Sequence, residues 1–103
     1  MLAAKDISTV ATGRSLGHPV RCLKTPLSNE YARLEASGVS AHELEGLGTG
    51  ALRRAAKEGD YEHGSFLCGQ IAGMVRERQS AREIVDDLVN GAELVLQGAG
   101  AWV

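Results

Sequence analysis

The chain has 103 residues, with 11 basic and 13 acidic side chains that give a formal net charge of −2. This length suits one domain and is too short for two. The lack of a basic excess argues against a nucleic-acid-binding protein. No apolar run reaches about 18 residues, so the sequence predicts no membrane-spanning helix.

The first quarter of the chain, up to about residue 26, carries no helical periodicity. Glycine and proline interrupt it repeatedly, so it is predicted as loop with a short extended piece around Val20–Leu23. Cys22 and Cys68 lie far apart without a CxxC motif, and the N-terminus lacks the basic-then-apolar layout of a signal peptide. Both cysteines are therefore expected to be reduced thiols of a cytoplasmic protein.

Helical segments are predicted to follow. The first covers about 27–37, and the second begins at Ser40, which forms an S-x-x-E capping box with Glu43. Helical periodicity resumes over 51–59, with Gly59 as the expected C-terminal cap. Local signals thus predict a mainly α chain with an irregular or short β N-terminal part.

The clearest predicted helix runs from Ser80 to about residue 97. Ser80 and Glu83 form a second capping box, and Gly98 follows the helix. Its apolar residues recur at helical spacing and trace one face: Ile84, Val85, Leu88, Val89, Ala92, Val95 and Leu96. Such a face needs a partner surface.

The segment GSFLCGQIAGMV, which starts at Gly64, is apolar and uncharged but contains three glycines and one amide. We interpret it as a helix reaching about Glu77, on which Gly69 and Gly73 share one face and allow close approach of another backbone. Gln70 must then find hydrogen-bond partners. Two interpretations stay open: a packed core helix, or a helix start against a planar ligand.

Other motifs give weaker signals. GLGTG, Gly46–Gly50, lacks the preceding strand of a dinucleotide fingerprint and fits a turn between helices better. His18, His42 and His63 are isolated from one another and from the cysteines, so the sequence predicts no metal site. No catalytic residue is assigned, because no histidine has a recognisable orienting partner.

Taken together, the ordered motifs GHPVRCLKTPL, LGTGALRRAAKEGDYEHGS and CGQIAGMV, followed by an amphipathic helix, resemble one flavoenzyme family. This family contains the nitronate monooxygenases, formerly 2-nitropropane dioxygenases, and the FMN-dependent enoyl-acyl carrier protein reductases. The similarity covers residues 5 to about 97 and corresponds to the C-terminal region of the family. Phe66, Leu67 and Cys68 depart from the Val-Met-Ala that is common there.

The resemblance implies a (β/α)8 barrel that binds FMN and carries a small helical domain. A complete barrel needs about 250 residues, so this chain is expected to hold the helical domain and pocket-closing segment in 1–79 and the final barrel helix and tail in 80–103. The family's catalytic histidine would lie outside the chain. By resemblance, Gly69 and Gln70 would contact the cofactor, and Ser65, Phe66 and Leu67 would line the substrate pocket.

Two functions from different classes compete. In the first, the chain is part of an FMN-dependent oxidoreductase that oxidises nitronates or uses NAD(P)H to reduce its substrate, a small molecule in either case, and is inactive alone. In the second, it is a stand-alone helical module that associates with a barrel portion or with itself. Neither involves nucleic acid or a membrane.

Overall fold

The computed structural model describes residues 2–102. The elements in chain order are β1 (Thr9–Thr12), β2 (Val20–Leu23), α1 (Pro26–Ala36), α2 (Ala41–Gly48), α3 (Ala51–Arg53), η1 (Arg54–Glu58), η2 (Gln70–Met74), α4 (Ala81–Ala99) and η3 (Gly100–Trp102). The mainly α prediction with a short β part near the N-terminus is confirmed. The division at residue 79 stays a prediction, and its outer limits, residues 1 and 103, lie outside the described residues.

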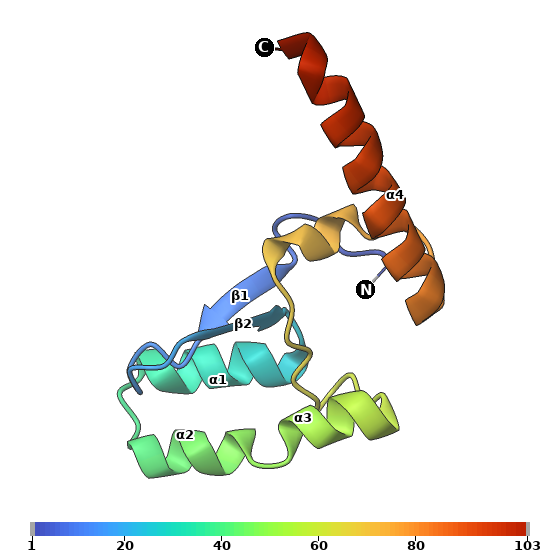
Figure 1. The fold of residues 1–103 in the computed structure, drawn as a ribbon. Coiled ribbons are helices and arrows are strands. Elements are labelled where there is room, and N and C mark those ends of the chain that lie inside the picture. The colour runs from blue at the N-terminus through green and yellow to red at the C-terminus, as the bar shows by residue number, and fades with distance from the viewer. Residues whose placement is uncertain (1, 103) are drawn as a thin grey trace.

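β1 and β2 form an antiparallel hairpin with Thr9 opposite Leu23 and Thr12 opposite Val20. The predicted extended piece is therefore β2. Gly13, with φ +81°, and Gly17, with φ +80°, bend the connecting loop, because an L side chain rarely adopts positive φ. Figure 1 shows the hairpin lying over α1, with α2 and α3 beyond it.

Capping residues fix the starts of three helices. The predicted boxes are present: Ser40 and Glu43 cap α2, and Ser80 and Glu83 cap α4, each by reciprocal side-chain-to-backbone hydrogen bonds. α1 begins with a box of the same kind between Thr25 and Ser28, both of which are buried. Ser28 thus belongs to the first turn of α1.

After α2, the chain bends at Gly50, with φ +75°, and continues through α3 into η1. η1 is a π-helix, a turn one residue wider than an α-helical turn. Gly59 ends it in the left-handed conformation, as predicted. Gly46 and Gly48 lie inside α2, so only Thr49 and Gly50 of GLGTG form the predicted helix-to-helix connection.

The segment from Gly64 to Glu77 is not the predicted helix. Its first part is extended and lies beside β2: Leu23 N donates to Phe66 O at 2.9 Å, and Cys68 N donates to Arg21 O at 3.2 Å. Only Gln70–Met74 is helical, as a short 3-10 turn. A short apolar run fits either a strand or a helix, and pairing with the free edge of β2 decides in favour of the strand.

As a result, Gly69 and Gly73 do not stack on a helix face. Gly69 is extended, with φ −80° and ψ 176°, and precedes η2. Gly73 does allow close backbone approach: a Cβ there would lie 2.7 Å from both Asp6 N and Lys5 C. The N-terminal loop therefore packs on η2.

α4 extends away from the rest of the protein (Figure 1). Including α4, the longest dimension is 55 Å. None of its residues is buried, and the large side chains of its apolar face are open: Ile84, Val85, Leu88, Val89, Val95 and Leu96 are each at least 45% exposed. The apolar core is correspondingly small and consists of Cys22, Leu44, Ala51 and Ala72. Among residues 2–102, no helix has both the length and the apolar character needed to cross a bilayer.

We predict that Gly64→Ala lowers the free energy of unfolding by about 1–3 kcal/mol, because overpacking a closed backbone contact carries that cost. A Cβ at Gly64 would overlap the carbonyl oxygen of Asp60 and lie 2.9 Å from Ala55 N. Gly69→Ala is the matched control, since its Cβ would meet only an Ile71 methyl at 4.0 Å. Urea unfolding measures both, and equal effects would contradict the packing assigned to Gly64.

Candidate functional site

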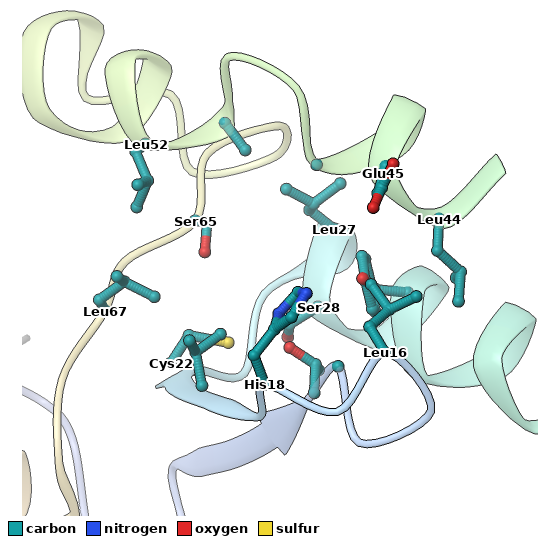
Figure 2. Close-up of a pocket in the computed structure, with 16 residues that line it drawn as sticks. Leu16, His18, Cys22, Leu27, Ser28, Leu44, Glu45, Leu52, Ser65 and Leu67 are labelled. Carbon is teal, nitrogen blue, oxygen red and sulfur yellow. The ribbon is translucent and has the colours of Figure 1, made fainter. Parts of the chain in front are cut away.

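The described residues line a partly open apolar cavity of about 270 Å³, which we call the central cavity. The hairpin and its loop form one wall, and α1, α2, α3 and the extended segment 65–67 form the others. Figure 2 shows Leu52 and Leu67 at one end of the cavity and Leu16 and Leu44 at the other. Segments far apart in sequence therefore build it.

Two of the three residues expected in the substrate pocket line the central cavity. Ser65 and Leu67 face it, whereas Phe66 does not. This follows from strand geometry, because successive side chains of an extended chain point to opposite faces. The backbone of Phe66 instead holds the segment, by accepting the hydrogen bond from Leu23 N.

A compact turn ahead of Ser65 positions it. The carboxylate of Asp60 accepts hydrogen bonds from the backbone N–H groups of Glu62 and His63 at 3.0 Å, and its second oxygen lies 3.0 Å from His63 Nδ1. The hydrogen bond from the His63 backbone, more than any other contact, lowers the pKa of Asp60. Gly64 N then bonds to Asp60 O, and Ser65 N bonds to Ala51 O at 3.0 Å. Much of the EGDYEHGS motif thus serves to place Ser65.

Glu35, near the end of α1, holds the hairpin loop in place through hydrogen bonds. Its carboxylate accepts hydrogen bonds from Gly13 N, from Ser15 N at 2.8 Å and from Ser15 Oγ at 2.7 Å. The Ser15 backbone bond is the largest cause that lowers the pKa of Glu35. Gly13, Leu16 and His18 of this loop line the central cavity, so Glu35 helps to fix one of its walls.

The expected cofactor residues lie elsewhere. Gln70 lines a separate, more polar hollow of about 350 Å³ between η2 and the N-terminal loop, together with Lys5, Asp6, Gly73 and Arg76. Its side chain is exposed and makes no hydrogen bond within the part of the chain that the structure describes. Neither Gly69 nor Gln70 lines the central cavity, on which Ser65 and Leu67 lie.

Gly69 and Gln70 meet one requirement of a flavin-binding site, which is open space beside the backbone together with an unengaged hydrogen-bonding group. Space beside Gly69 is open apart from the Ile71 methyl, and the Gln70 amide is unengaged within residues 2–102. A planar ring edge could approach both. The phosphate of FMN has no comparable cradle in GLGTG, whose first residues are part of α2.

The cysteines remain free thiols. Burial is the main cause that raises the pKa of the Cys22 thiol, with the nearby Cys68 as the second cause. A raised pKa makes Cys22 a poor nucleophile at neutral pH. Among the residues placed by the structure, no group of three or more His, Cys, Asp or Glu side chains could hold a metal ion.

The sequence reasoning missed most of the central cavity, because its walls come from five segments. His18 and Leu52 lie on it but carry no local signature. Leu27 and Tyr31, at helical spacing on α1, are the one available signal, since they mark the face that α1 turns toward the cavity.

No protein-family model and no curated protein matches the chain. Among solved structures, FabK from Thermotoga maritima superposes with a TM-score of 0.86 and 33% identity, over 99% of this chain and 32% of FabK. A point mutant of the same FabK gives a TM-score of 0.76 and 30% identity, over 99% of this chain and 29% of the mutant. The chain therefore spans about a third of these proteins. This similarity supports the family resemblance drawn from the sequence.

We predict that Glu35→Gln weakens the acid sensitivity of the fold. Because the pKa of folded Glu35 lies below its ordinary value of 4.5, its contribution to stability is present above that pH and is lost as pH falls through the folded-state pKa. Urea midpoints at about pH 7 and about pH 3.5 should differ less for Glu35→Gln than for wild type. If the difference between the two urea midpoints is the same in Glu35→Gln as in wild type, Glu35 does not contribute to the acid sensitivity. Glu45→Gln is the control variant.

Proposed function

We propose that the chain is a portion of an FMN-dependent oxidoreductase. FabK is an FMN-dependent enoyl-acyl carrier protein reductase of the nitronate monooxygenase family. The observation that carries the proposal is the match to FabK over 99% of this chain at a TM-score of 0.86 and 33% identity. Sequence and backbone agree along the whole chain, which favours a shared structural role over a common local motif.

Within such an enzyme, FMN would supply the electron transfer and this chain would position groups around it. Gly69 would let the flavin edge approach, and the Gln70 amide would donate or accept a hydrogen bond there. Ser65 and Leu67 would form one wall of the substrate site. The family histidine would belong to another part of the enzyme, so the chain alone would be inactive.

The finer assignment within the family rests on the substrate. We propose a small-molecule substrate, which is either a nitronate that the enzyme oxidises or an enoyl thioester that it reduces with electrons from NAD(P)H. We also propose a cytoplasmic location, which suits the free thiols Cys22 and Cys68. The exposed apolar face of α4 supports packing against a barrel portion, as expected of a final barrel helix. Uncovered, that face leaves large aliphatic side chains in water.

The same face favours the second candidate, a stand-alone module that associates with itself. A stable dimer of the isolated chain in sedimentation, lost in the α4 variant Val89→Glu, would support it. A monomer at all accessible concentrations would count against self-association, because the apolar stripe would then have no partner in solution.

The decisive experiment replaces the matching third of Thermotoga FabK with this chain. The chimera should purify with bound FMN and should either oxidise NAD(P)H in the presence of an enoyl thioester or consume O2 in the presence of a nitronate, each assayed separately. The same FabK without its matching third is the control. A chimera that folds but neither retains flavin nor turns over with either substrate would refute the proposed function.

We predict that Gln70→Ala in that chimera lowers turnover about three- to tenfold, as expected for one lost hydrogen bond. The melting temperature should stay nearly unchanged, because Gln70 makes no hydrogen bond within residues 2–102. Spectrophotometric turnover and thermal melting give the two readouts. Loss of stability with normal turnover per folded molecule would instead assign Gln70 a packing role.

A further inference from the structure

We propose that segment 76–78 is a cleavage site for endopeptidases that cut after basic residues. We call this segment, which consists of Arg76, Glu77 and Arg78, the joint. A cut in the joint detaches α4 from residues 2–75, which we call the body. The site lies within this chain and involves no flavin chemistry.

The joint connects two elements whose facing ends are anchored. On the body side, Val75 N donates a hydrogen bond to Ala72 O at 3.2 Å and thereby ends η2. On the other side, Ser80 and Glu83 form the capping box that starts α4. The side-chain amide of Gln79 also donates a hydrogen bond to a carboxylate of α4. The anchored parts therefore stop on either side of the joint.

The joint itself lacks regular structure. Its three residues are exposed and belong to no helix or strand. Their backbone N–H and C=O groups form no hydrogen bond with any residue between 2 and 102. A protease takes its substrate in an extended conformation, and a segment without backbone hydrogen bonds reaches that conformation at little cost in free energy.

Packing of α4 does not protect the joint either. None of the α4 residues is buried, and Figure 1 shows the helix extending away from the body. The Cα radius of gyration is 17.7 Å, whereas a compact domain of this length has a radius of about 13 Å. Because no buried surface ties α4 to the body, the joint can bend into a protease without breaking tertiary packing.

The other basic residues are held by local structure. The chain has 11 Lys and Arg residues, of which two lie in the joint, so nine remain. Six of the nine belong to helices or strands: Arg21, Arg33, Arg53, Arg54, Lys57 and Arg82. The other three, Lys5, Arg14 and Lys24, have backbone groups in hydrogen bonds. A cut at any of these nine must first disrupt such bonds, so the joint is the preferred site.

The cut is a hydrolysis with a defined effect on the molecule. Water adds across the peptide C–N bond after Arg76 or Arg78, with its hydroxyl on the arginine carbonyl carbon and its hydrogen on the released nitrogen. The larger product keeps every residue that lines the central cavity. It loses the exposed apolar face of α4. Cleavage thus removes a surface for association with a barrel portion or a second copy, a consequence that rests on the association proposed above.

Limited digestion of the full chain with trypsin tests the site. Mass spectrometry at early times should find a first cut after Arg76 or Arg78. Amide hydrogen exchange gives an independent readout, since the Glu77 and Arg78 amides should exchange as fast as those of an unstructured peptide. A first cut at any of the nine other basic residues, or protection of both amides, would overturn the assignment.

Variants separate the joint from general fragility of the fold. The double variant Arg76→Gln, Arg78→Gln should slow loss of the full chain at least about tenfold, because the acidic specificity pocket of trypsin then has no basic side chain to bind. The matched control, Arg33→Gln with Arg53→Gln, removes two exposed helical arginines and should leave the rate unchanged. Circular dichroism verifies that both variants fold. If the joint variant does not fold, the hydrogen-exchange measurement on wild type decides.

This result is separable from that of the flavoenzyme proposal. A first cut in the joint together with an inactive chimera would keep the cleavage site and remove the oxidoreductase role. An active chimera together with a first cut elsewhere in the isolated chain would do the reverse.

Discussion

The pairing of segment 66–68 with the edge of β2 is the constraint on which the rest of the structure depends. Two hydrogen bonds, Leu23 N to Phe66 O and Cys68 N to Arg21 O, join parts of the chain more than 40 residues apart in sequence. Because side chains alternate along an extended segment, this pairing directs Ser65 and Leu67 to one face and Phe66 away from it. Without it, the central cavity would lose one of its walls.

Two glycines that flank the paired segment, Gly64 before it and Gly73 after it, allow close backbone packing. Gly64 lets the chain leave the Asp60 turn against Ala55, and Gly73 lets η2 lie on the N-terminal loop. Gly69, between them, meets almost nothing within the described chain. Two of the three glycines thus have a packing reason inside the protein, and the third is open to whatever lies outside it.

Local signals predicted the elements whose ends are set by nearby residues. The boxes at Ser40 and Ser80 and the cap at Gly59 each depend on residues within a few positions, so the sequence is sufficient to find them. The Thr25 box escaped notice because Ser28, not Glu, completes it. The segment after Gly64 was wrongly taken as a helix because its pairing partner, β2, lies far away in sequence. The central cavity could not be predicted either, because its lining residues also come from segments far apart in sequence.

The tight fit of Gly73 on Lys5 and Asp6 has a topological consequence. The chain from that loop runs into β1, β1 pairs with β2, β2 pairs with segment 66–68, and this segment leads into η2, which returns to the loop. These contacts form a closed circuit of chain connections, hydrogen bonds and close packing. The hollow at Gln70 and the central cavity at Ser65, although separate in space, are thus bordered by segments of the same ring.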